Sequence, residues 1–139
     1  MRVERIQETC LYAEDLAAAE RFYSGVLGLQ VYLKDAERHV FFRCGRQMFL
    51  VFKSTRTSLP GQSVPAHGAR GPGHVAFAVR GAELDAWRVH LQVHGVPIEQ
   101  DAEWAEGRGQ SLYFRDPAGN SVELITPEAW GVGEEVVFG

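Results

Sequence analysis

A histidine stands at the start of HVAFAV, His74 to Val79, a run typical of a buried β-strand. Imidazole can move protons near neutral pH or bind a ligand, but a histidine at a strand start is also often structural. Glu123, inside SVELI, is either a site carboxylate or the solvent-facing side of an edge strand, and Glu8, opening ETCLYA, is either a site carboxylate or a solvated charge. Proton transfer or ligand binding requires that the fold bring these groups together.

The elements that must position these residues occur twice in the same order. In the first half, the strand ETCLYA is followed by Asp15 as a helix N-cap, by apolar residues at helical spacing and by Gly28 as the helix stop, before a second strand. The second half has a strand from His74, an amphipathic helix that ends at Gly95, and VPIE as the next strand. The sequence therefore contains an internal repeat.

Each half closes with a predicted hairpin. HVFFRCGRQMFLVF places Gly45-Arg46 in a two-residue type II′ turn, and SLYFRDPAGNSVELI places Asp116 to Gly119 in a type I turn. Each half is then β-α-β-β-β, an α+β fold. Residues 54–70, rich in Ser, Thr, Pro and Gly, are expected to be a connecting loop.

The hairpin turns fix which side chains lie opposite one another. Tyr113 is predicted to lie opposite Glu123, and Phe41 opposite Leu50, on one face of each sheet. The apolar residues that face the helices instead are Phe42, Phe49, Val51, Phe114, Val122 and Leu124.

Aligning the two halves pairs equivalent positions. The first strands place Glu8 against His74, a separation of 66 residues, and the last strands place Leu50 against Glu123, a separation of 73 residues. Four equivalent positions therefore hold Glu8, His74, Leu50 and Glu123.

The composition favours a small-molecule partner. Against 18 Asp and Glu there are 14 Lys and Arg, a net charge of −4, with no basic run to bind nucleic acid or an anionic membrane. The N-terminal MRVERIQE lacks a secretory signal, and no apolar run approaches the roughly 20 residues of a membrane span. We expect a soluble cytoplasmic protein with Cys10 and Cys44 as free thiols.

The sequence resembles the vicinal oxygen chelate superfamily, the glyoxalase/bleomycin-resistance/dioxygenase group, as far as about Pro127. YFRDPAGNSVELITP is similar to the closing strand-turn-strand of the family, GHVAFAV to the start of its second module, and ETCLYAEDLAAAERFYSGVLGL to the start of its first. The resemblance implies two βαβββ modules whose sheets curve into a cup. The expected divisions are a glyoxalase-like domain at 1–127, with modules 4–53 and 71–127 and linker 54–70, and a C-terminal tail at 128–139.

The resemblance also implies one divalent metal ion on the floor of the cup, held by Glu8, His74 and Glu123. The family usually has His or Gln at the position of Glu8, and members with a fourth ligand have it at the position of Leu50, where leucine cannot coordinate. Two carboxylate oxygens and one imidazole nitrogen suit Zn, Mn, Ni or Fe.

By this resemblance the protein is a metal-dependent enzyme of isomerase or lyase type that chelates a small substrate through adjacent oxygens. Glu123, or Glu8 in a looser contact, is the candidate catalytic base. An extradiol-type dioxygenase is less favoured because those sites usually carry two histidines and one carboxylate. The alternative is a metal-free binding or sequestration protein of the bleomycin-resistance type.

Other residues on the inner face are expected to contact substrate. By the alternation of strand residues they are Tyr12, His39, Phe41, Tyr113 and Arg115. Arg115 suits an anionic group, but an ion pair with a neighbouring acid is an equal alternative. The family resemblance implies a homodimer, and the tail is expected to pack on the cup or on a second subunit.

Overall fold

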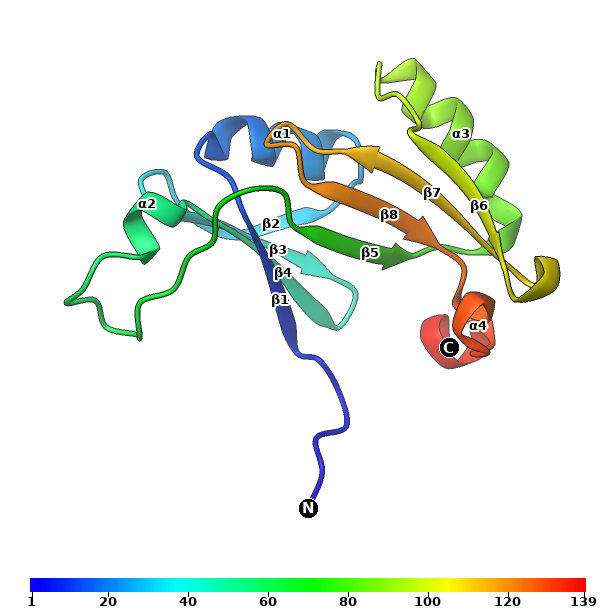
Figure 1. Ribbon diagram of the computed structural model, residues 1–139, viewed down its shortest axis with the longest axis horizontal. Helices are drawn as coiled ribbons and strands as arrows, with labels where there is room; N and C mark the ends of the chain where they lie inside the picture. Colours follow the sequence, from blue (N-terminus) through cyan, green and yellow to red (C-terminus); the bar gives the residue numbers. More distant parts are fainter. The chain divides into compact units, whose positions relative to one another are not determined.

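The repeat predicted from the sequence is present as two four-stranded mixed sheets. The computed structural model describes residues 1–139, which divide into two compact units, Met1–Gly73 and His74–Gly139. Each unit has a helix between the first and second strands of its sheet (Figure 1). The predicted α+β fold of two tandem βαβββ modules is confirmed.

The first unit has the sheet order β1-β4-β3-β2, with β1 parallel to β4 and the other pairs antiparallel. Asp15 is the helix N-cap, as predicted, because its carboxylate accepts a hydrogen bond from the Ala18 backbone N–H at 2.9 Å. The elements of this unit are β1 (Glu8–Tyr12), α1 (Leu16–Gly25), β2 (Gln30–Asp35), β3 (His39–Cys44), β4 (Gln47–Phe52) and the short α2 (Ser54–Thr57).

The expected connecting loop after β4 begins with a helical turn. Helix α2 was not predicted, because four residues are too few for an apolar period. Thr57 in this helix is fully buried, and its carbonyl accepts a hydrogen bond from the His67 backbone N–H at 2.9 Å. The segment after the sheet therefore folds back on itself.

The second unit has the matching sheet order β5-β8-β7-β6, with β5 parallel to β8. Its strands and α-helices are β5 (His74–Ala78), α3 (Leu84–Val93), β6 (Gln100–Trp104), β7 (Gly109–Arg115), β8 (Ser121–Ile125) and α4 (Glu134–Phe138). Three 3₁₀ turns accompany them: η1 (Gly81–Glu83), η2 (Ala105–Gly107) and η3 (Pro127–Trp130).

The prediction of a strand at VPIE is wrong. The strand β6 begins at Gln100, and residues 96–99 connect it to the end of α3 without forming a strand. Pro97 has no N–H to donate to a strand ladder, which accounts for the displacement. Only Glu99 approaches the next strand there, donating its backbone N–H to the Tyr113 carbonyl at 2.7 Å.

The strand pairings follow the predicted alternation. Tyr113 lies opposite Glu123, and Phe41 lies opposite Leu50. The residues predicted to face the helices are all buried: Phe42, Phe49, Val51, Phe114, Val122 and Leu124. In the first unit, Tyr23 of α1 packs on Phe49 with ring centroids 4.7 Å apart.

The pairing of the first and last strands confirms the alignment of the two halves. Glu8 pairs with Met48 in the first unit, and His74 pairs with Ser121 in the second. The separations, 66 residues from 8 to 74 and 73 from 48 to 121, are those of the sequence alignment.

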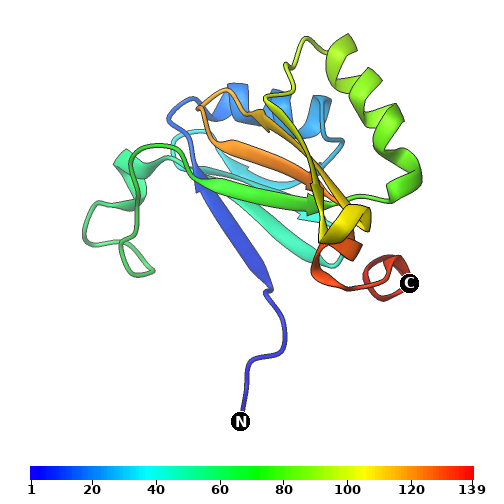
Figure 2. The ribbon, with the colours of Figure 1, turned by 45° about the vertical axis from the view of Figure 1, so that its right-hand side comes forward.

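The C-terminal segment packs on its own unit, beside the β6–β7 turn (Figure 2). The Gln110 backbone N–H donates to the Thr126 hydroxyl at 3.1 Å, and the Thr126 backbone N–H donates to the Gln110 carbonyl at 3.0 Å. Gly109 lies so close to η3 that a Cβ there would be 2.4 Å from the Ala129 backbone. In α4, the Glu134 carboxylate accepts from the Gly81 backbone N–H at 2.7 Å.

No helix of the structure combines the length and the apolar character needed to cross a membrane. Cys10 and Cys44 are half-buried free thiols, as expected. Burial raises the pKa of the Cys44 thiol.

We expect Gly109→Ala to destabilise the protein by about 1–3 kcal/mol, because the added methyl group collides with the backbone of Ala129. Gly25→Ala is the matched control. Its methyl group meets no atom within 4 Å at the end of α1, so it should stabilise by about 0.5–1 kcal/mol. Urea unfolding of both variants measures the difference, and equal effects would contradict close packing of the C-terminal segment.

Candidate functional site

Glu123 is a buried carboxylate at the centre of the second sheet. Its strand, β8, lies between β5 and β7, and Glu123 is only 5% exposed. The solvent-facing alternative for this residue is therefore wrong. A buried carboxylate needs hydrogen-bond donors or positive charge around it, because removing its charge from water is costly.

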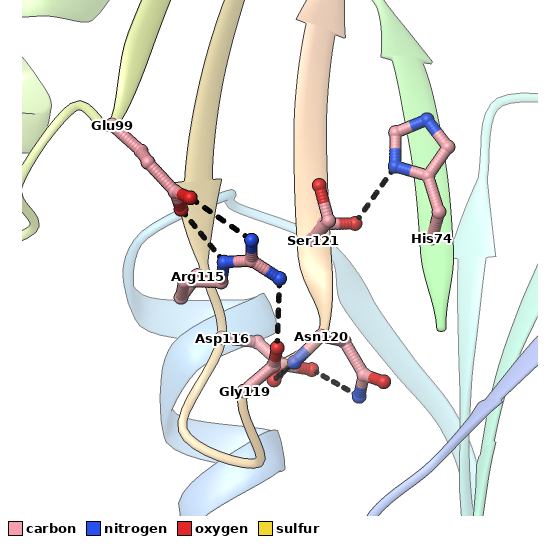
Figure 3. Close-up of polar contacts among 7 residues, drawn as sticks. All are labelled: His74, Glu99, Arg115, Asp116, Gly119, Asn120 and Ser121. Atoms are coloured by element: carbon pink, nitrogen blue, oxygen red, sulfur yellow. Dashed lines mark hydrogen bonds and ion pairs between the residues drawn. The ribbon is translucent and has the colours of Figure 1, made fainter. Parts of the chain in front are cut away.

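His74 faces one oxygen of this carboxylate. Its Nε2 lies 3.2 Å from Glu123 Oε2, and its side chain is 50% exposed. Its Nδ1 lies 3.1 Å from the Ser121 carbonyl oxygen (Figure 3). Because a carbonyl can only accept, Nδ1 carries the proton, and this contact aims Nε2 at the carboxylate. His74 is thus oriented by the backbone of the neighbouring strand.

The other carboxylate oxygen is held by two residues that the sequence analysis missed. The Ser111 hydroxyl donates to Glu123 Oε1 at 2.5 Å, and the Trp104 indole N–H donates to the Ser111 hydroxyl at 2.8 Å. Ser111 is fully buried. The alternation already used for Tyr113 places Ser111 on the same face, so its hydroxyl was detectable, whereas Trp104 lay outside the run assigned as a strand.

Tyr113 completes the surroundings of Glu123. Its ring lies roughly parallel to that of His74, with centroids 6.2 Å apart. Burial, then the hydrogen bond and charge of Glu123, raise the pKa of Tyr113, against a smaller opposing effect of Ser111. Tyr113 is therefore a neutral phenol at physiological pH.

The turn before β8 is fixed from inside. The Asp116 carboxylate accepts hydrogen bonds from the backbone N–H groups of Ala118 and Asn120, at 2.9 and 2.8 Å, and from the Asn120 amide at 2.9 Å. Asp116 and Asn120 are both buried, and Figure 3 shows the contact between them. This network fixes the entry into β8, the strand that carries Glu123.

The sequence left two partners open for Arg115, an anionic group of the substrate or a neighbouring acidic residue. In the structure Arg115 forms an ion pair with an acidic residue. Its guanidinium contacts both carboxylate oxygens of Glu99, at 2.7 and 3.0 Å, and donates to the Gly119 carbonyl at 3.2 Å (Figure 3). The hydrogen bond from Arg115 lowers the pKa of Glu99. The Arg115 side chain points toward Glu99 and forms no hydrogen bond or ion pair with Glu123.

In the first unit, Glu8 lies exposed at the start of β1, opposite Met48. The position equivalent to Glu123 is Leu50, which is buried. Neither unit by itself gathers three His, Cys, Asp or Glu side chains that could hold a metal ion. The second unit by itself brings together only His74 and Glu123.

The other residues predicted to contact substrate form an aromatic group in the first unit. His39 stacks on Phe41 with centroids 4.1 Å apart, and the Tyr12 hydroxyl lies 2.7 Å from His67 Nδ1. Phe52 packs between them, 5.4 Å from Phe41 and 4.7 Å from His67 between ring centroids. Burial, with the charge of a neighbouring arginine, lowers the pKa of His39. Sequence reasoning missed His67 because it lies in the connecting segment.

Comparison with known proteins identifies the family. The sequence model that describes the Glyoxalase/Bleomycin resistance protein/Dioxygenase superfamily matches residues 5–124 of this chain. The chain belongs to this superfamily. The match spans both units, and it confirms the family resemblance inferred from the three motifs.

Individual members of the superfamily resemble the chain to different degrees. A crystal structure of lactoylglutathione lyase from Agrobacterium tumefaciens is 44% identical with a TM-score of 0.89, over 94% of this chain and 98% of that one. Fosfomycin resistance protein FosX from Mesorhizobium japonicum is 25% identical over 89% of this chain and 86% of its own. A variant of Listeria monocytogenes FosX, solved with Mn(II) and a dihydroxypropylphosphonic acid, is 20% identical with a TM-score of 0.68, over 92% of this chain and 95% of that one, and shows the shared fold.

We expect Arg115→Gln to raise the pKa of Glu99 toward its ordinary value, because the guanidinium is the main cause of its lowering. A carboxyl with a lowered folded-state pKa stabilises the protein above its unfolded pKa, and this contribution is lost as the pH falls through the folded value. The variant should thus be less stable at neutral pH, with a smaller difference in acid. NMR titration of the Glu99 carboxyl carbon measures the shift.

Arg43→Gln is the control for this titration, since Arg43 lies over the Tyr32 ring in the other unit. An unchanged Glu99 titration in Arg115→Gln would show that the ion pair does not persist in solution.

Proposed function

We propose that the protein is a divalent-metal-dependent enzyme of isomerase or lyase type, which binds a small substrate through two adjacent oxygens. The observation that carries this proposal is the arrangement around Glu123. One carboxylate oxygen is fixed by Ser111, and the other faces the Nε2 atom of His74. A buried carboxylate beside an imidazole whose proton is on the far nitrogen is a typical pair of metal ligands.

The distance between these two donors supports a metal ion between them. Two ligand atoms at about 2.0–2.2 Å from one metal ion, at an angle of about 90–110°, lie about 2.8–3.6 Å apart. The separation of His74 Nε2 and Glu123 Oε2 is 3.2 Å, within this range. An imidazolium–carboxylate ion pair has a similar length, so metal titration is the deciding experiment.

We assign the third ligand to Glu8. It is the residue equivalent to His74 in the first unit, and it is an exposed carboxylate with no carboxylate beside it in its own sheet. The Glu8 carboxylate that binds the metal ion would belong either to the same chain or to a second copy of the chain. We expect a homodimer, because the strand edges of β1 and β5 remain open in their own sheets.

A bound divalent metal ion would polarise a substrate carbonyl and stabilise the negative charge that develops on its oxygen. The residues around it have separate tasks. Glu123 has partners at both oxygens, so Glu8 is the better candidate to take the proton next to the carbonyl. Tyr113, a neutral phenol with Glu123 as a hydrogen-bond partner, would help to hold this carboxylate in place.

The relatives support lyase-type chemistry on this fold. The structure that is 44% identical is described as a lactoylglutathione lyase, and the relative that is 25% identical is described as a fosfomycin resistance protein. The higher identity and TM-score of the lyase favour a substrate with a carbonyl next to a hydroxyl-bearing carbon. Shared fold alone does not determine the reaction.

A metal-free binding protein is the second candidate. It is favoured by Leu50, which occupies the position equivalent to Glu123, and by the aromatic group of the first unit, in which His39, Phe41 and His67 are half-buried. Such a protein would use aromatic contacts and need no metal ligands. Metal content separates the two candidates.

We expect the purified protein to bind about one divalent ion per chain and His74→Ala and Glu123→Ala to bind it more than about 100-fold more weakly, because each loses a ligand. The controls are His90→Ala on α3 and Glu103→Ala on β6, which should keep the metal. Elemental analysis without affinity-tag nickel, followed by Mn(II) and Co(II) titrations, measures this. A parent protein that binds neither ion would favour the metal-free candidate.

For the reaction, we expect turnover of α-hydroxyketones or thiohemiacetals by the metal-loaded protein. Glu8→Gln should lower kcat by about 10²–10⁴-fold, the usual contribution of a general base. Because the amide oxygen can still bind metal, metal affinity should fall less than in Glu123→Ala. Unchanged kcat in Glu8→Gln would exclude Glu8 as the base.

A further inference from the structure

We propose that Ser111 is a positioning residue for Glu123, and that Trp104 fixes the Ser111 hydroxyl for this task. The inference rests on the proposed metal-binding function. It adds a chain of hydrogen bonds, from indole to hydroxyl to carboxylate, that decides which oxygen of Glu123 is available to a metal ion.

The direction of this chain follows from the chemistry of its members. An indole N–H can only donate, so the Ser111 oxygen is the acceptor in its 2.8 Å contact with Trp104. A serine hydroxyl has one proton to give, and the 2.5 Å contact shows that it goes to Glu123 Oε1. Trp104 therefore orients the hydroxyl, and Ser111 neutralises part of the charge on one carboxylate oxygen.

The burial of the chain makes this contact costly to lose. Ser111 is fully buried and Glu123 is 5% exposed, so water cannot readily replace the hydroxyl. Every buried side-chain nitrogen or oxygen in the structure has a hydrogen-bond partner. Without the Ser111 hydroxyl, Oε1 would lose a donor in a place that water does not reach.

The chain leaves Oε2 as the oxygen that faces His74. The two candidate ligands are then held in the same manner: the Ser121 carbonyl accepts from His74 Nδ1, Ser111 donates to Glu123 Oε1, and the remaining atoms, Nε2 and Oε2, face each other at 3.2 Å. Groups that orient metal ligands in this way commonly change metal affinity by about 10–100-fold.

The place of Trp104 in the fold is suited to this role. It ends β6 opposite Gly109 and diagonal to Ser111 on the neighbouring strand. The turn that follows passes through left-handed conformations at Ala105 and Glu106, with φ of 51° and 58°, which ordinary residues adopt at a cost. Trp104 is 40% exposed, so its indole ring lies partly in solvent. A smaller side chain at this position would therefore not open a cavity in the core.

The test compares metal affinity in Ser111→Ala, Ser111→Thr and Trp104→Phe, measured for Mn(II) and Co(II) by competition with a chromophoric chelator. We expect Ser111→Ala to weaken binding by about 10–100-fold. Ser111→Thr keeps the hydroxyl and should restore affinity. Trp104→Phe removes the indole N–H donor together with part of the ring and should give a smaller loss, with Trp130→Phe, 82% exposed, as the unchanged control.

The unfolding temperature of each metal-free variant separates positioning from folding. If Ser111→Ala lowers that temperature but binds metal as the parent does, the residue is only structural and the inference is wrong. Should Ser111→Thr fail to fold, the comparison of Trp104→Phe with Trp130→Phe decides, and equal affinities would overturn the inference. A parent protein that binds no metal overturns the proposed function as well, so the two failures are distinguishable.

Discussion

The burial of one carboxylate, Glu123, is the constraint on which the rest of the second unit depends. A charge taken out of water must be matched by donors or by positive charge, and the two strands that flank β8 supply them. Ser111 and Tyr113 come from β7 and His74 from β5, while Asp116 holds the turn that leads into β8. Because each group lies on a hydrogen-bonded strand, the site is built on rigid backbone.

The two units share a backbone plan but differ in chemistry at equivalent positions. Where the second unit has Tyr113 opposite Glu123, the first has Phe41 opposite Leu50. Only the second unit therefore buries a charged residue in its sheet face. The first unit instead carries an aromatic group that includes His67 from the connecting segment.

The chain belongs to a superfamily whose members are described as lyases and as antibiotic resistance proteins. One fold supports these functions because the reaction depends on a few side chains on the sheet faces, while the helix-facing residues keep the strands together. For this protein, the orientation of His74 by the Ser121 carbonyl and of Glu123 by Ser111 is the feature on which the proposed metal binding rests.

The sequence by itself determined the strand register. Gly45 and the run from Asp116 to Gly119 specify tight turns, and a turn fixes the pairing of the strands it joins, so Tyr113 could be placed opposite Glu123 from local residues alone. Only the tertiary structure decided which polar groups meet. The contact of Trp104 with Ser111 and the ion pair of Arg115 with Glu99 join side chains across strands, and they depend on rotamers and diagonal neighbours that alternation does not specify. The packing of the C-terminal segment against Gly109 depends in the same way on contacts between segments distant in sequence.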